Sequence, residues 1–113
     1  MTTSKKFIKG DEIDWEVVGE GIKRKILAFD DRVMLVNVHF EKGAIGVLHD
    51  HHHTQVPYIE SGKFDDSFDG VTETLKLGDS FYIPPHAVHG VLCLEAGMLT
   101  DVFSPMREDF LQY

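Results

Sequence analysis

The sequence predicts an all-β fold, a small single-domain β-barrel of the jelly-roll type. Short apolar runs are separated by Gly, Asp or Pro, helical periodicity is hardly sustained, and turn residues recur at regular spacing. Many short strands at such spacing are typical of an antiparallel sandwich or barrel. A chain of 113 residues fits one domain of ordinary size. We therefore expect one domain over residues 1–113, with an N-terminal arm at 1–18 and a barrel core at 40–104.

Each expected strand is a run rich in apolar residues that is bounded by turn residues. In chain order these strands are 22–29, 33–40, 55–59, 72–77, 80–83, 90–94 and 99–103. The turns that separate them fall at 30–31, 41–43, 61–62, 69–70, 77–79 and 95–97. After the last strand, residues 105–113 are expected to form one helical turn or to cover a barrel end.

Composition excludes several classes of partner. The formal net charge of −8 disfavours nucleic acid and an anionic membrane surface. Cys93 is the single cysteine, so no intramolecular disulfide framework exists, and we expect it to be a small core residue. The first fifteen residues contain no long apolar run, so neither a signal peptide nor a membrane span is expected, and cytoplasmic residence is the default.

Two glycine-bounded segments indicate a metal site. In the first, at 43–62, His49 and His51 are two residues apart and Gln55 follows. Residues two apart on a strand point to the same face, and a bend can bring the Gln55 oxygen to the two imidazoles. The second segment, at 78–90, places His89 after two prolines. We expect these three imidazoles and one amide oxygen to bind one divalent transition metal, and Zn, Ni, Mn, Fe and Co suit this donor set alike.

Other polar residues near these segments leave alternatives open. His52 and His53 are expected to support the site or to face solvent, with His53 as the alternative ligand. His86 lies in the proline turn, and whether it lines the pocket rim stays open. His39 is expected to be packed or on the surface. Successive residues of a strand point to opposite faces, so Arg24 and the two lysines beside it lie on different faces of the strand. If the lysines face solvent, Arg24 points inward.

Both segments resemble the motifs of one protein family. The pattern G-x5-H-x-H-x3-Q-x6-G at 43–62 resembles the first cupin motif, with Gln55 where most cupins have glutamate. The pattern G-x5-P-x4-H at 78–89 resembles the second, although His86 and Cys93 stand where glycine and asparagine are usual. The resemblance implies an RmlC-like cupin barrel around a bound metal. The departures at Gln55, His86 and Cys93 do not change the spacing of the three histidines in the two motifs.

A closer resemblance is to the small cupins of pectin degradation, the KdgF type. It is carried by segments at 19–27, 40–46 and 100–111 and by the His-x-His pair with Gln55. Proteins of this type convert 4,5-unsaturated uronates into linear 5-keto-4-deoxyuronate. The resemblance therefore implies a metal-dependent, isomerase-type enzyme that opens the ring of a small anionic sugar acid. Whether the substrate derives from galacturonate or mannuronate stays open.

The end of the chain supplies the candidate catalytic residues. Leu99, Asp101 and Phe103 share one strand face, and an acid between two large apolar residues suits the wall of a cavity. Arg107 follows shortly after Pro105 and can fold over the same opening. The family's tail motif supplies an aspartate, a phenylalanine and an arginine that match Asp101, Phe103 and Arg107. We expect them to serve as acid/base, apolar wall and carboxylate anchor, the alternative for Asp101 being a structural carboxylate paired with an arginine.

Two other functions remain open at the level of sequence. A non-catalytic or sensory cupin could bind a sugar acid or only a metal, but such a protein has little use for a buried acid beside the metal. A cupin oxygenase would need redox-active iron or copper, which the three histidines and Gln55 do not exclude.

We also expect a homodimer. The arm at 7–15 contains two aromatic residues and two isoleucines and is too apolar to lie exposed, and a small barrel has edge strands to cover. The resemblance points the same way, since small cupins are usually dimeric.

Overall fold

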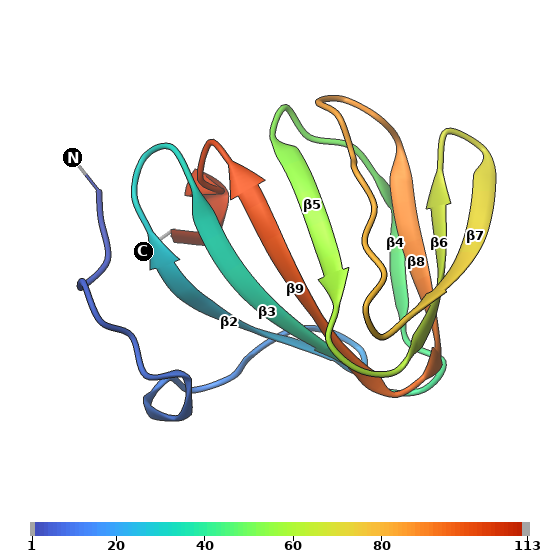
Figure 1. Ribbon diagram of the computed structural model, residues 1–113, viewed down its shortest axis with the longest axis horizontal. Helices are drawn as coiled ribbons and strands as arrows, with labels where there is room; N and C mark the ends of the chain where they lie inside the picture. Colours follow the sequence, from blue (N-terminus) through green and yellow to red (C-terminus); the bar gives the residue numbers. More distant parts are fainter. Residues whose placement is uncertain (1, 112–113) are drawn as a thin grey trace.

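Two antiparallel sheets lie face to face in the computed structural model of the chain, which describes residues 2–111 (Figure 1). One sheet has the strand order β1-β2-β3-β9-β5 and the other has the order β4-β8-β6-β7. The strands are β1 (Glu16–Gly19), β2 (Ile22–Phe29), β3 (Met34–Phe40), β4 (Ile45–His49), β5 (Thr54–Ile59), β6 (Lys63–Phe68), β7 (Val71–Lys76), β8 (His89–Glu95) and β9 (Gly97–Ser104). Short 3₁₀ helices lie at η1 (Gly10–Glu12) and η2 (Glu108–Leu111). The predicted all-β architecture is confirmed.

The sequence missed three strands and predicted one that the structure lacks. β1, β4 and β6 were not expected, while the prediction of 22–29 matches β2 at both ends. The expected strand 80–83 is wrong, because only isolated bridges join this segment to β5. The Phe81 N–H donates to the carbonyl of Pro57 in β5, but proline has no N–H to return the bond. The pairing with β5 is therefore interrupted at its centre.

Two apolar clusters fill the space between the sheets. The first contains Phe40, Ile59, Phe64 and Leu99 together with Cys93, which confirms that the cysteine is a core residue. The second contains Met34, Val36 and Phe103, and apolar side chains of the C-terminal tail pack against it. The tail thus forms a short helical turn and also covers an end of the barrel. Residues 112–113 of the predicted tail lie outside the described residues.

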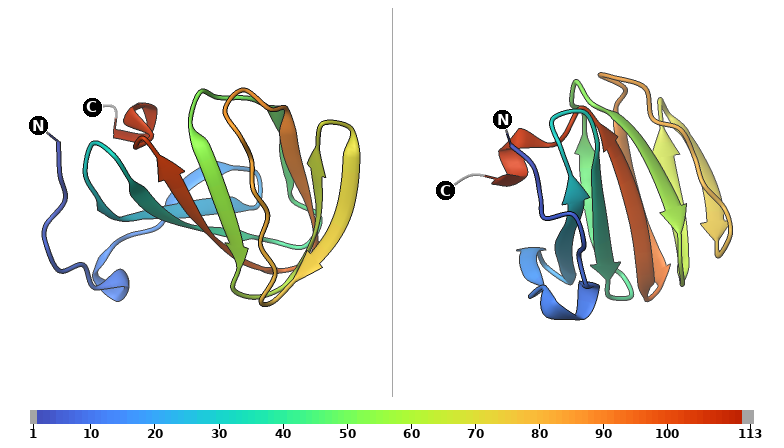
Figure 2. Two further views of the ribbon diagram at one scale, coloured as in Figure 1. Left: turned by 45° about the horizontal axis from the view of Figure 1, so that its top comes forward. Right: turned by 60° about the vertical axis from the view of Figure 1, so that its left-hand side comes forward.

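The N-terminal arm runs beside the larger sheet (Figure 2). Backbone N–H of Ser4 donates to the carbonyl of Phe29 at 2.9 Å. The Trp15 ring lies against the ammonium groups of Lys23 and Lys25 on β2, at 4.9 and 4.6 Å from the ring centroid. The arm therefore has contacts within its own chain, whereas Phe7 is 89% exposed. Within residues 2–111 no helix is long and apolar enough to cross a membrane.

Candidate active site

The ends of several strands meet at one end of the barrel, the upper end in Figure 1. His49 is the last residue of β4 and lies directly opposite His89, the first residue of β8. Their ring centroids are 4.3 Å apart. Glycines allow this close approach, because a Cβ added at Gly90 would lie 2.8 Å from the carbonyl oxygen of Gly46. The two strands therefore bring two imidazoles together from distant parts of the sequence.

His51 reaches the same point from a loop. It lies beyond the end of β4, so the prediction that His49 and His51 share a strand face is wrong in detail. A shift of register in β4 and a bend at 52–53 redirect the chain there. The backbone N–H of His86 donates to the carbonyl of His51 at 2.7 Å and holds the loop. One nitrogen each of His49, His51 and His89 lies within 4.8 Å of the others.

Hydrogen bonds orient all three imidazoles alike. The Nδ1 atoms of His49, His51 and His89 donate to backbone carbonyls at 2.8, 3.1 and 2.9 Å. A neutral imidazole has one N–H, so each Nε2 keeps a free lone pair. The buried Nε2 of His89 has no hydrogen-bond partner among the described residues. Burial lowers the pKa of His51 to about 4 and also lowers the pKa of His89, so both rings stay neutral.

Gln55 adds an oxygen to this group. Its Oε1 lies 2.9 Å from the Nε2 of His51. A neutral His51 ring has one N–H, which can be donated either from Nδ1 to the His53 carbonyl or from Nε2 to Gln55 Oε1; in the first tautomer the Nε2 lone pair lies beside Oε1. In that tautomer both atoms can bind the same cation. The group of three imidazoles and one amide oxygen therefore fits a divalent metal ion.

A cavity of about 180 Å³ lies beside these residues, between the two sheets. Its polar lining residues include Arg24, His49, Gln55, Asp66, His89, Asp101 and Arg107. As predicted, Leu99, Asp101 and Phe103 are buried on one face of β9. Arg24 also points inward as predicted. Its guanidinium carbon lies 3.7 Å from the centroid of the Phe110 ring.

Asp101 is a buried acid next to the group that could hold a metal. Its side chain is 5% exposed, and its Oδ1 has no hydrogen-bond partner among the described residues. Burial raises the pKa of Asp101 to about 6, although a hydrogen bond from Gln55 and the positive charge of Arg107 oppose the rise. A carboxyl with this pKa can both accept and donate a proton near neutral pH.

Arg107 lies at the cavity wall and is held in place by its neighbours. Its guanidinium carbon is 5.1 Å from the ring centroid of Phe103 and 4.2 Å from that of Phe110. Its Nε and Nη2 donate to the two oxygens of Asp109 at 3.0 and 2.8 Å. This bidentate pair uses one edge of the guanidinium and fixes its plane. Asp109 is a positioning residue that sequence reasoning missed.

Asp66 is a second buried acid that sequence reasoning missed. It lies on β6, lines the cavity and is 4% exposed. Burial raises the pKa of Asp66 to about 7, and the negative charges of Asp101 and Asp65 add to the rise. Two consecutive aspartates look like a solvated turn in the sequence. The signal that could have revealed Asp66 is its strand parity with Phe64, which points into the core.

The remaining histidines of the first segment connect the loop to the tail. His53 is buried, and its Nε2 lies 3.2 Å from Oε2 of Glu108 on η2. His52 is exposed and approaches Oε1 of the same carboxylate at 3.7 Å. These three residues also lie close enough to hold a metal ion. His86 is exposed and is not among the residues that line the cavity, so the structure does not place it at the pocket rim.

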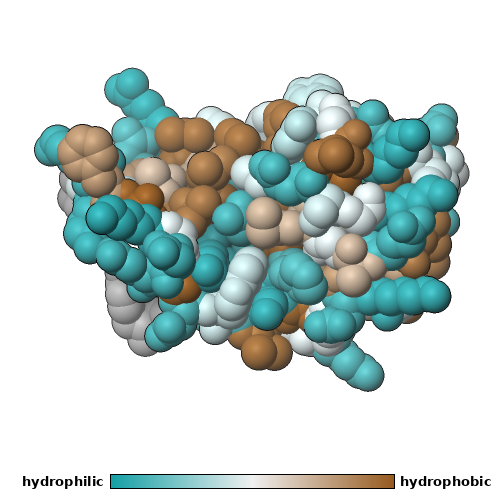
Figure 3. Space-filling view, turned by 60° about the horizontal axis from the view of Figure 1, so that its bottom comes forward, coloured by the Kyte–Doolittle hydropathy of each residue, from teal (hydrophilic) through white to brown (hydrophobic). Residues whose placement is uncertain are grey.

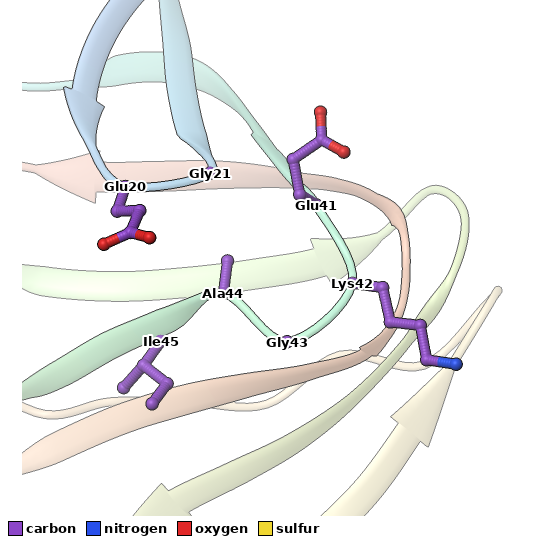
Figure 4. Close-up of a pocket in the computed structure, with 7 residues that line it drawn as sticks. All are labelled: Glu20, Gly21, Glu41, Lys42, Gly43, Ala44 and Ile45. Carbon is purple, nitrogen blue, oxygen red and sulfur yellow. The ribbon is translucent and has the colours of Figure 1, made fainter.

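A larger hollow of about 510 Å³ lies elsewhere, between the β1–β2 turn and the loop that leads into β4 (Figure 4). Its charged residues are Glu20, Glu41 and Lys42. In Figure 4 the side chains of Glu41 and Lys42 point in different directions, and Lys42 points away from the hollow. Because no polar groups converge there, the smaller cavity beside the histidines is the better candidate site.

Comparisons with known proteins agree with the fold. The sequence matches the Cupin domain family over residues 36–103. It is 45% identical over 109 residues to the pectin degradation protein KdgF of Dickeya dadantii, an alignment that covers 95% of this chain and 99% of that protein. An RmlC-like cupin from Shewanella frigidimarina has a TM-score of 0.94 at 45% identity, over 97% of this chain and 99% of that one. The structure of KdgF from a Halomonas species has a TM-score of 0.91 at 38% identity, and the match covers 95% of this chain and 99% of that one.

Proposed function

Because the chain belongs to the cupin family, and within it to the family of the pectin degradation protein KdgF, we propose that it opens the ring of 4,5-unsaturated uronates. These sugars are released in pectin or alginate breakdown, and the product is linear 5-keto-4-deoxyuronate. The observation that carries the proposal is a buried acid, Asp101, in one cavity with Arg107 and the histidine group. The pKa of Asp101, raised by burial to about 6, suits an acid that moves a proton near neutral pH, which a ring-opening enzyme needs and a protein that only bound a metal does not.

In this proposal, His49, His51, Gln55 and His89 hold one divalent transition metal. The metal, when bound, supplies a Lewis acid that polarises an oxygen of the substrate. Its identity among Zn, Ni, Mn, Fe and Co is not fixed by the donor set. The backbone carbonyls that accept from the three Nδ1 atoms keep each imidazole in the ligating tautomer.

The reaction is an isomerisation in which one proton moves. The substrate is a cyclic enol ether, with its ring oxygen attached to the alkene carbon C5. The carboxylate of Asp101 accepts the proton of the C1 hydroxyl, the bond from C1 to the ring oxygen breaks, and C1 becomes an aldehyde. The ring oxygen stays on C5 as an enolate. Protonated Asp101 then gives the proton to C4, and C5 becomes a ketone.

The other two tail residues bind and orient the sugar. The guanidinium of Arg107 pairs with the uronate carboxylate, which a protein of net charge −8 would otherwise repel. Phe103, which is buried beside Arg107, forms an apolar wall for the sugar ring. Nothing in this scheme needs an oxidant or a reductant.

Identification of the product tests the proposal. The metal-loaded protein is incubated with the unsaturated monouronate from pectin, and the products are followed by NMR. We expect the alkene proton signal to disappear and the signals of the linear 4-deoxy-5-keto acid to appear faster than in buffer. Oxidised or cleaved products that require O₂ would favour an oxygenase and contradict the proposal.

Replacing Arg107 by Ala is expected to weaken substrate binding more than chemistry. A hydrogen bond to a charged group contributes about 1.5–3 kcal/mol, which corresponds to a rise in KM of roughly ten- to a hundredfold. We expect kcat to change by only a few-fold. Arg32→Ala, at an exposed position, is the matched control and should leave both constants unchanged. An unchanged KM in Arg107→Ala would show that the carboxylate is bound elsewhere.

We further propose that the protein is a homodimer in which the N-terminal arm contacts the partner. Phe7 is 89% exposed, and the edge strands β1 and β4 expose Val17 and Val47 at 79% and 71%. Hydrophobic residues gather in the upper left of the face shown in Figure 3, next to hydrophilic ones.

Light scattering tests the oligomeric state at micromolar concentration. We expect a mass of twice the 12.8 kDa chain. Phe7→Asp should shift the protein toward the monomer, whereas Tyr82→Asp, at an exposed aromatic residue away from the arm, should not. A monomeric parent protein would refute the dimer.

A further inference from the structure

Asp66 is not explained by the scheme above. Its carboxylate is buried in the wall of the candidate cavity, and neither of its oxygens has a hydrogen-bond partner among the described residues. We propose that Asp66 binds a hydroxyl group of the sugar and thereby fixes the ring relative to Asp101. This inference rests on the proposed function, because it takes a uronate as the ligand.

The sheet topology places Asp66 and Asp101 on facing walls. Asp66 belongs to β6 of the four-stranded sheet, and Asp101 belongs to β9 of the five-stranded sheet. Both side chains line the cavity between the sheets. A sugar ring in this cavity would therefore have Asp101 on one side and Asp66 on the other. Contacts from both walls fix the orientation of a ring better than contacts from one wall.

Asp66 lacks the partners that a structural carboxylate has. A buried polar group without a hydrogen bond destabilises the folded state, and a buried charge does so more strongly. Burial raises the pKa of Asp66 to about 7, as expected for such a group. Its neighbour Asp65 points to the other face and accepts from the Thr74 hydroxyl at 2.6 Å. Asp66 instead presents to the cavity two oxygens that have no hydrogen-bond partner within residues 2–111, as a binding residue does.

The charges of a uronate indicate that Asp66 contacts its hydroxyl groups and not its carboxylate. The substrate offers one anionic group and several hydroxyl groups. Its carboxylate would be repelled by Asp66 and attracted by Arg107, which lies at the same cavity. A hydroxyl group can donate a hydrogen bond, and hydrogen bonds that a carboxylate accepts are stronger than those between two neutral groups. Arg107 and Asp66 therefore favour the same orientation of the sugar, with its carboxylate toward Arg107 and its hydroxyl groups toward Asp66.

The test compares Asp66→Ala and Asp66→Asn with the matched control Asp65→Asn, which makes the same charge change at the adjacent residue of β6. For Asp66→Ala, at parent metal content, we expect KM for the unsaturated monouronate to rise roughly ten- to a hundredfold while kcat changes by only a few-fold. The melting temperature of the substrate-free Asp66→Asn protein should be a few degrees above that of the parent, because an unpaired buried charge is removed. Asp65→Asn should leave KM at the parent value.

Several results would overturn the assignment. An unchanged KM with a lower melting temperature would make Asp66 a structural residue. A large fall in kcat at unchanged KM would make it a carrier of the proton. If Asp66→Ala does not fold, Asp66→Asn decides, because it keeps the side-chain volume and should still raise KM several-fold. If the parent itself is no faster than buffer, the proposed function fails and this inference fails with it. A parent that is active while both variants keep its KM overturns the inference alone.

Discussion

Replacing Asp101 by Asn will lower turnover of the unsaturated uronate by about a hundred- to ten-thousandfold. This corresponds to a loss of about 3–5 kcal/mol of transition-state stabilisation. The reason is that the amide keeps the shape and position of the side chain but cannot take the proton from the C1 hydroxyl or return it to C4. Metal content should stay at the parent level, because Asp101 is not among the proposed ligands.

Steady-state rates at equal metal content measure this effect. The control is Asp65→Asn, which removes a carboxylate from the opposite face of the smaller sheet and should keep the parent rate. A turnover equal to the parent's in Asp101→Asn would show that another group moves the proton. Asp101 would then be a structural carboxylate, which was the alternative at the level of sequence.

The double substitution His49→Ala, His51→Ala is expected to abolish metal binding and with it the catalysed reaction. Removing a residue that only supports a ligand typically costs about ten- to a hundredfold in metal affinity, and two direct ligands contribute more. The remaining His89 and Gln55 are too few for a stable site. Metal analysis of dialysed protein should show about one ion per chain in the parent and a small fraction of one in the variant.

His86→Ala is the control for this experiment, because the side chain of His86 is exposed and only its backbone contacts the ligand loop. It should retain the parent metal content. Full occupancy in the double variant would contradict the proposed ligands. If the ion were then lost on replacing His53, the group of His52, His53 and Glu108 would be its site.

The parts of the fold that the sequence predicted are those with a local signal. β2 and β9 were predicted because apolar and polar residues alternate or cluster between clear turns. The face shared by Asp101 and Phe103 followed from strand parity, which holds wherever a strand is regular. The grouping of His49 with His89 followed from two spaced motifs, although the sequence alone does not show that β4 and β8 are neighbours.

The parts that the sequence missed depend on contacts between distant segments. β6 was missed because its two aspartates look solvated, and their opposite environments arise only when β6 lies between β7 and β8. The segment 80–83 was predicted as a strand, but Pro57 on the neighbouring strand interrupts its pairing. His51 reaches the site through a loop that the backbone N–H of His86 holds. The role of Asp109 requires the fold of the tail around Arg107.

The central claim is that this protein opens unsaturated uronates with a bound metal, and one measurement tests it most directly. The ultraviolet absorbance of the conjugated alkene is followed in buffer, with metal-loaded protein, with protein stripped by a chelator, and with stripped protein after metal is added back. We expect fast loss of absorbance with the loaded protein, the buffer rate after stripping, and recovery on reloading. A fully metallated protein that consumes the sugar no faster than buffer would contradict the claim.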